Sequence, residues 1–218
     1  MTAYLTRIPM FFAGPTFAAG LAIMQPQMTA LEGLSGPGAF LASLAAEPNA
    51  WLAGHLLMLA AAVLYLFAAI GIARELSGHR PVTARLLPVP MMIGTLGLVG
   101  NFTLDLVYGA LATGLEPEAA LLARDALLAS QPLQMTFAMI GPMLFPLGMF
   151  IIALPILITG WLPRIAGALI LGGWAFVMTQ HGAFPYAEAV GHFIVGSGFI
   201  WIAVLSRPDR PARPHRRG

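Results

Sequence analysis

The chain has 218 residues, of which 58% are hydrophobic and only 9% are charged. Soluble domains carry about 25% charged residues, so a chain this apolar cannot cover its surface with polar groups in water. It has no cysteine, which excludes disulfides, thiolate metal sites and cysteine nucleophiles. It also has no lysine, which excludes a cofactor bound as a Schiff base to a lysine side chain. The composition predicts an integral membrane protein.

Six apolar stretches are long enough for membrane-spanning helices, since each crossing takes about 20 residues. We therefore expect an all-α fold, with one polytopic transmembrane bundle of six helices over 1–205. Pro15 predicts a kink in the first span, and Pro142, Pro146 and Pro155 predict a bent or broken fourth span. The expected spans are 8–25, 50–73, 86–112, 133–159, 165–180 and 186–205.

Two segments between the spans have helical character of a different kind. The segment 39–46 predicts a short amphipathic helix on the surface, and 116–130 predicts a second surface helix. Glu116 directly precedes Pro117, and acidic residues favour the N-terminus of a helix. The end of the chain, 206–218, is rich in arginine and proline and is expected to be a disordered tail.

Arginine is distributed unevenly among the connecting segments. If the N-terminus lies inside, ten arginines fall on inner segments and only Arg124 falls outside. Inner loops of membrane proteins are enriched in arginine, so both termini are predicted to be cytoplasmic. The Ala-, Gly-, Pro- and Arg-rich composition is typical of bacteria, which makes the bacterial cytoplasmic (inner) membrane the expected location. The inner arginines are Arg7, Arg74, Arg80, Arg85, Arg164, Arg207, Arg210, Arg213, Arg216 and Arg217.

Polar side chains gather near the outer ends of the expected spans. At about 1.5 Å of rise per residue, His55, Asp105 and His192 lie roughly 7–10 Å below the outer ends of three different helices. His181 and Gln134 fall at the ends of two further spans. Ionisable groups in hydrocarbon are expensive unless they face one another, water or a cation. The sequence therefore predicts that these groups converge on one interior cavity open to the outer side.

Helical spacing strengthens this hypothesis. Residues 101, 105 and 108 are spaced i, i+4, i+7 and share one helix face. Residues 188 and 192 are four apart, so the carboxylate can orient the imidazole as it does beside ligating histidines. We predict two sets of site residues: His55, His192, His181 and Asp105 as metal- or haem-binding residues, and Asn101, Tyr108, Gln134 and Glu188 as residues that support them or bind substrate.

The same residues have structural alternatives. Histidines near helix ends can reach the lipid head groups, and Asp105 and Asn101 can join helices by hydrogen bonds. Trp51, Trp161 and Trp201 are expected in interfacial belts, and the methionines are expected to face lipid or fill the core. The sequence holds no Walker loop, no His-Glu-x-x-His and no nucleophile elbow, so it predicts no particular reaction.

Two short motifs carry a resemblance. Trp51 and His55 open the second span after a polar loop, and Leu162, Pro163 and Arg164 form a turn before the fifth. In outline the chain resembles uncharacterised six-span bacterial membrane proteins, which implies a six-helix bundle and no activity. Its three outer histidines, His55, His181 and His192, together with Asp105, are similar in number to the site residues of ceramidase and adiponectin-receptor hydrolases. Those proteins have seven spans and a His-x3-His pair, and this chain has neither.

Three functions remain open from the residues. The first is a ligand site that holds a divalent metal or haem b, because imidazole suits iron, zinc and copper alike. The second is a transporter or receptor for a small polar solute or proton. The third is a structural or accessory subunit of a membrane complex. The expected partners are the lipid bilayer and a membrane protein or second copy of the chain, with no nucleic acid.

Overall fold

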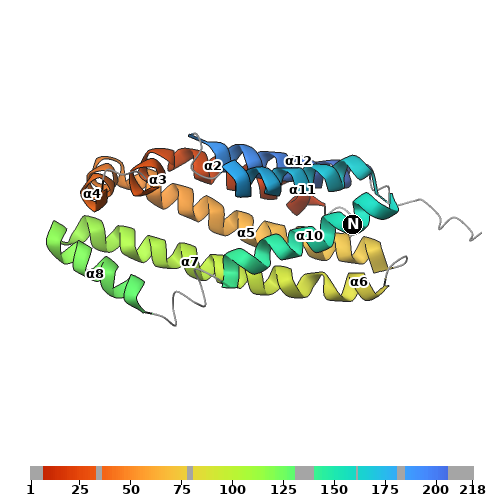
Figure 1. Ribbon diagram of the computed structural model, residues 1–218, viewed down its shortest axis with the longest axis horizontal. Helices are drawn as coiled ribbons and strands as arrows, with labels where there is room; N and C mark the ends of the chain where they lie inside the picture. Colours follow the sequence, from red (N-terminus) through yellow and green to blue (C-terminus); the bar gives the residue numbers. More distant parts are fainter. Residues whose placement is uncertain are drawn as a thin grey trace, which may run out of the picture.

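The computed structural model describes residues 7–32, 36–77, 81–130, 140–160, 162–180 and 185–205. In these residues every regular element is a helix, which confirms the expected all-α class (Figure 1). The helices are α2 (Ile8–Ile23), α3 (Gln25–Glu32), α4 (Gly36–Ala46), α5 (Pro48–Ser77), α6 (Pro81–Leu86), α7 (Pro88–Gly114), α8 (Pro117–Ala129), α10 (Gly141–Thr159), α11 (Arg164–Gln180) and α12 (Ala187–Leu205).

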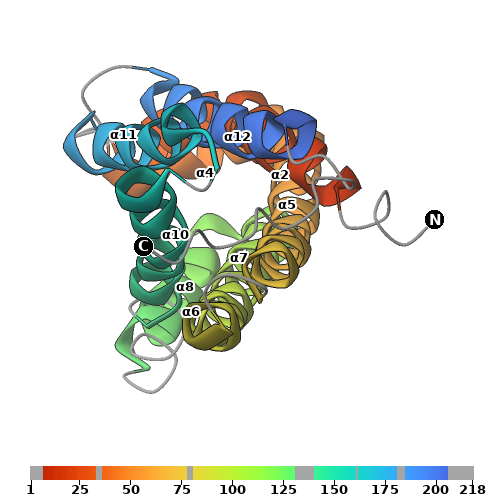
Figure 2. The ribbon, with the colours of Figure 1, turned by 90° about the vertical axis from the view of Figure 1, so that its right-hand side faces the viewer.

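The six long helices form a closed ring. Each packs against two neighbours, in the order α2, α5, α7, α10, α11, α12 and back to α2. Seen along the long axis, the ribbons surround a common centre (Figure 2). Helices far apart in sequence therefore meet, since α12 completes the ring against α2. A side chain that points inward from any of the six can reach the same central space.

Three helical segments of the described chain are long and apolar enough to cross a membrane. They are Pro48–Ser77, Pro81–Gly114 and Ala187–Leu205, while Ile8–Ile23 and Met143–Thr159 are shorter apolar helices. Their length and composition indicate a membrane protein.

Glycine sets the closest helix crossing of the ring. Gly14 of α2 lies directly against Gly196 of α12, and a Cβ on either would collide with the backbone of the other. Two helices approach this closely only where neither carries a side chain at the contact. Gly173 makes a similar contact between α11 and α12, where an added Cβ would lie 2.8 Å from the Gly191 carbonyl oxygen.

The short helices differ in part from the expectation. Helix α8 matches the segment 116–130, and α4 covers the segment 39–46, but α3 lies where the sequence predicted only a loop. Phe40 and Leu44 of α4 are buried, so α4 closes the end of the ring rather than lying on the surface alone. The expected tail, 206–218, lies outside the described residues.

The prolines of the expected first and fourth spans are accommodated within helices. Helix α2 continues through Pro15 without interruption. Helix α10 is α-helical from Gly141, with Pro142 in its first turn, and Ile140 directly before it is π-helical, a local departure from the α-helical ladder. Pro146 and Pro155 are inside α10, and the residues 133–139 of the expected fourth span lie outside the described residues.

Candidate functional site

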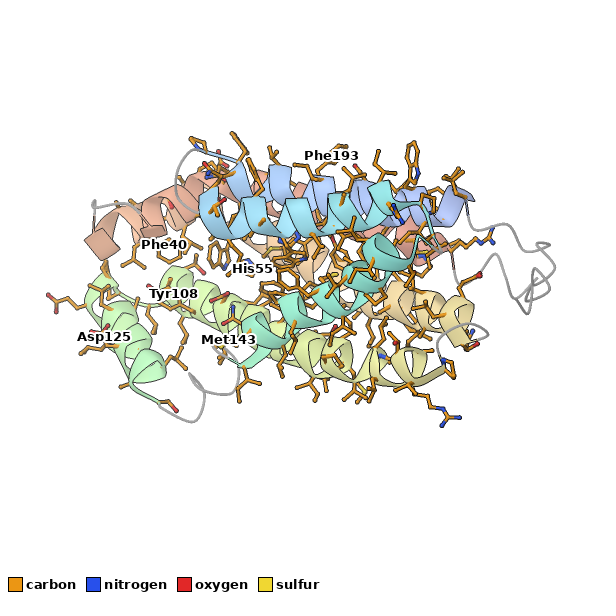
Figure 3. The ribbon with its side chains drawn as sticks, turned by 45° about the vertical axis from the view of Figure 1, so that its right-hand side comes forward. Phe40, His55, Tyr108, Asp125, Met143 and Phe193 are labelled. Atoms are coloured by element: carbon orange, nitrogen blue, oxygen red, sulfur yellow. The ribbon has the colours of Figure 1, made fainter. Side chains whose placement is uncertain are left out.

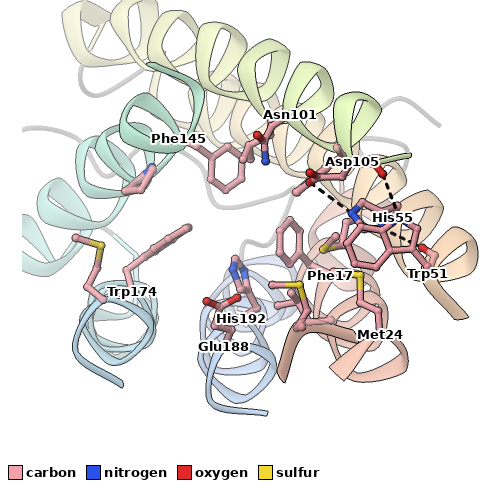
Figure 4. Close-up of a pocket in the computed structure, with 17 residues that line it drawn as sticks. Phe17, Met24, Trp51, His55, Asn101, Asp105, Phe145, Trp174, Glu188 and His192 are labelled. Atoms are coloured by element: carbon pink, nitrogen blue, oxygen red, sulfur yellow. Dashed lines mark hydrogen bonds and ion pairs between the residues drawn. The ribbon is translucent and has the colours of Figure 1, made fainter. Parts of the chain in front are cut away.

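A cavity of about 460 Å³ occupies the centre of the ring (Figure 4). All six long helices contribute to its wall, which is mostly aromatic and thioether side chains with a few polar groups. The lining residues are Phe17, Leu21, Met24, Met28, Trp51, His55, Met58, Leu98, Asn101, Phe102, Asp105, Phe145, Pro146, Trp174, Met178, Glu188 and His192.

An imidazole–carboxylate pair joins α5 and α7 at one side of the cavity. His55 Nε2 lies 3.5 Å from Asp105 Oδ2, and His55 Nδ1 lies 2.9 Å from the backbone oxygen of Trp51. A carbonyl oxygen only accepts, so Nδ1 carries a proton and donates it. Nε2 then faces the carboxylate either as a lone pair or as a second N–H. The two contacts hold the imidazole between the backbone of α5 and the carboxylate of α7.

Trp51 fixes the position of this pair. Its indole Nε1 donates a hydrogen bond to the Asp105 backbone oxygen, with a distance of 3.1 Å. The indole lies over Gly109, where an added Cβ would come within 2.6 Å of Cδ1. Trp51 is only 4% exposed, so its expected place in an interfacial belt is wrong. The sequence puts glycine one turn after Asp105, and that leaves room for the ring.

Phe40 of α4 covers the outward side of Trp51. Its ring meets the indole edge-on at a centroid distance of 5.2 Å and stacks on Tyr108 at 5.6 Å. Figure 3 shows Phe40 and Tyr108 close together at the end of the bundle, beyond His55. Tyr108 therefore belongs to the closure of the ring and does not line the cavity.

His192 stands at another side of the cavity. Its ring stacks on Phe17 with a centroid distance of 4.0 Å and meets the edge of Trp174 at 5.1 Å. The side chain is buried, and Nδ1 has no hydrogen-bond partner in the described part of the chain. A buried nitrogen left without a partner costs about 1–3 kcal/mol, so the stacking on Phe17 and Trp174 holds this ring at some cost to stability. The next residue, Phe193, points away from the ring (Figure 3).

The structure brings five of the predicted site residues to one cavity. Asn101, Asp105, His55, His192 and Glu188 all line it, the last of these one helical turn before His192. The roles that the sequence predicted for them remain predictions. His181 and Gln134 lie outside the described residues.

The aromatic wall was missing from the sequence interpretation. Phe17, Phe145 and Trp174 come from three different helices, and nothing in their spacing marks them among the many aromatic residues of the chain. Met24 and Met58, interpreted only as filler, also line the cavity. Only the order of the helices around the ring places these side chains together.

A metal centre has limited support from the described side chains. Among them, no group of three or more His, Asp and Glu residues is placed to hold a metal ion. In Figure 4 the Phe17 ring lies between the two imidazoles, where a haem shared by His55 and His192 would have to sit. The expected metal or haem therefore fits the described residues poorly.

Comparisons of the chain with protein-family models, with curated proteins and with solved structures found no match. The function must therefore be argued from the cavity and its residues.

Proposed function

We propose that this chain is a six-span membrane protein that binds a small organic molecule in the centre of its helix ring. The observation that carries the proposal is the cavity of about 460 Å³ lined from all six long helices. Pockets for small molecules typically measure about 300–1,000 Å³ and combine apolar walls with a few polar groups. This cavity has that composition, with Asn101, Asp105 and the two histidines as its polar groups.

Packing alone explains the cavity less well than a ligand does. Protein interiors are close-packed, and empty spaces larger than a water molecule are few. The central space also holds ionisable groups, which are costly at membrane depth unless they have a function or a partner. An accessory subunit would need no such space. That alternative function would be preferred if no small molecule bound.

For the membrane topology we propose six passes with both termini in the cytoplasm of a bacterial cell. The arginine distribution supports this arrangement, because ten of the eleven arginines fall on one side. It places α4, α8 and the cavity toward the outer face. A membrane-protein partner or a second copy of the chain remains compatible with this arrangement.

Cysteine labelling tests the topology. The natural chain has no cysteine, so each substitution gives one unique thiol. In intact cells we expect a membrane-impermeant maleimide to label Ser130→Cys, after α8, and to leave Ser77→Cys, at the end of α5, unmodified. Permeabilising the membrane should expose Ser77→Cys. Labelling of Ser77→Cys in intact cells would overturn the proposed orientation.

Bromobenzene tests whether the cavity takes an organic molecule. It is neutral, small and a heavy-atom quencher of tryptophan, and both Trp51 and Trp174 line the cavity. We expect saturable quenching of the purified protein in nanodiscs, beyond the linear quenching caused by partition into lipid. Leu98→Phe places a larger side chain in the cavity. It should raise the Kd of the saturable quenching about tenfold or more, since a steric cost of about 1.4 kcal/mol gives a tenfold change in affinity.

The control lies two residues away on the same helix. Leu96 is exposed on α7 and does not line the cavity, whereas Leu98 is buried and does. Leu96→Phe adds the same volume and should leave the quenching curve unchanged. Equal weakening by both variants, or quenching that stays linear in the natural protein, would argue against a binding cavity.

Metal and haem are tested on the same preparation. Metal analysis and absorbance in the Soret region would reveal an occupant that His55 or His192 holds, and alanine at either position would remove it. The cavity volume alone does not distinguish a tightly bound cofactor from an exchangeable organic ligand. Metal analysis and Soret absorbance do, because only a metal or haem gives these signals.

A further inference from the structure

The ionisable side chains of the cavity wall are two carboxylates and two imidazoles, and none of them carries a permanent positive charge. The lining includes the carboxylates of Asp105 and Glu188 and the imidazoles of His55 and His192, and it includes no arginine. The chain has no lysine. An anionic ligand would meet no permanent positive charge in the described wall. A cationic ligand would meet two carboxylates, and charge interactions at a protein surface are stronger than in bulk water.

The aromatic rings of the wall favour the same sign of charge. Phe17, Phe102 and Phe145 line the cavity together with Trp51 and Trp174. The face of an aromatic ring is negative, so it attracts a cation within about 6 Å of its centroid, and tryptophan does so best. Figure 4 shows rings from several helices around one space, with Asp105 at one side and Glu188 at another.

The remaining wall argues for an organic cation over an inorganic one. Calcium requires about six to eight oxygen ligands, and magnesium requires near-ideal octahedral oxygen geometry. The side chains of the wall offer oxygen only from the carboxylates of Asp105 and Glu188 and the amide of Asn101; the remaining polar atoms are imidazole and indole nitrogens, and the rest is carbon and thioether sulfur. A cation that carries its own apolar groups can contact this wall without a complete shell of oxygen ligands.

We infer that the cavity binds small aromatic or alkyl ammonium compounds, with Asp105 as the main counter-charge and the aromatic rings as the cage around the cation. This inference rests on the proposed function and names its ligand class. Asp105 is suited to the role because its side chain is 41% exposed and lines the cavity, whereas its backbone is held by Trp51. A quaternary ammonium group has no N–H, so it would test charge recognition without hydrogen bonding.

Three probes of matched shape test the inference. Benzyltrimethylammonium, neopentylbenzene and benzylsulfonate share a benzyl group with a compact head that is cationic, neutral or anionic. Their binding to the protein in nanodiscs is measured as the shift in melting temperature with ligand concentration, corrected for partition into empty nanodiscs. We expect the ammonium to bind about tenfold more tightly than the neutral compound, the size of a desolvated cation–π contact, and the sulfonate to bind most weakly.

The variants locate the charge preference. Asp105→Asn should bring the cation-to-neutral ratio close to one while neopentylbenzene still binds. The control Asp125→Asn removes an exposed carboxylate on α8 that does not line the cavity, and it should keep the ratio of the natural protein. An unchanged ratio in Asp105→Asn would overturn the assigned counter-charge. The comparison of the three probes on the natural protein requires no variant, so it stands even if Asp105→Asn does not fold.

The outcomes separate the two proposals. If bromobenzene binds and Leu98→Phe weakens it, but the ammonium binds no better than the neutral compound, the cavity function stands and the cation inference is wrong. If benzylsulfonate binds best, the inference is wrong in sign. If none of the four compounds binds, both proposals are overturned.

Discussion

Replacing Gly14 with alanine is expected to destabilise the protein by about 2–3 kcal/mol, near the upper end of the usual cost of overpacking. The added Cβ would overlap the Cα of Gly196 and would lie 2.7 Å from the Gly196 nitrogen and 3.0 Å from the His192 oxygen. All three atoms belong to the backbone of α12, so no side-chain rotation relieves the contact. Helices α2 and α12 must separate, and this weakens the closure of the ring.

The same substitution should reach the cavity. His192 lies one turn before Gly196 on α12, and Phe17 lies about one turn after Gly14 on α2. The rings of His192 and Phe17 stack on each other. Separating these helices therefore disturbs the stacked pair as well as the glycine crossing. We expect the saturable quenching by bromobenzene to weaken in Gly14→Ala even at temperatures where the variant is fully folded.

Gly172→Ala is the control for this prediction. Gly172 lies in the middle of α11, and an added Cβ there would meet nothing within 4 Å. Alanine is favoured over glycine in a helix by about 1 kcal/mol, so this variant should be as stable as the natural protein or more stable. Thermal unfolding in the same detergent compares the two variants directly. Equal melting temperatures for Gly14→Ala and Gly172→Ala would contradict the close crossing.

The helices were predictable from the sequence because apolar length and connecting polar segments define them directly. The expected span 50–73 corresponds to α5, and 86–112 corresponds to most of α7. Helix α3 was missed because its residues, such as Gln25 and Gln27, give it little apolar character.

The polar half of the site was predictable and the aromatic half was not. Ionisable residues are rare in the spans, so depth and i, i+4 spacing sufficed to select His55, Asp105 and His192. Aromatic residues are common in the spans, and selecting Phe17 or Trp174 requires knowledge of which helices are neighbours. The contact by which α12 closes the ring against α2 cannot be predicted from the sequence, because it depends on glycines whose partners are far away in the chain.

The contact between His55 of α5 and Asp105 of α7 leads to the second prediction: the two residues are coupled in their contributions to the free energy of unfolding. His55→Leu alone should destabilise the protein, because it leaves the Asp105 carboxylate without the imidazole that faces it, and removing one member of a polar pair is costlier than removing both. Asp105→Leu alone should destabilise it less, since a neutral imidazole without a partner carries no charge.

The double variant His55→Leu/Asp105→Leu should be more stable than the sum of the two single losses implies. We expect a coupling free energy of about 1 kcal/mol, toward the lower end of the range for residues in contact, because the Asp105 side chain is 41% exposed and partly screened. Unfolding of the natural protein, both single variants and the double variant in one detergent gives this value. Combining His55→Leu with Asp125→Asn on the distant, exposed surface of α8 should be additive. Additivity in the His55 and Asp105 cycle would mean that the 3.5 Å approach of Nε2 to Oδ2 contributes nothing to holding the two helices together.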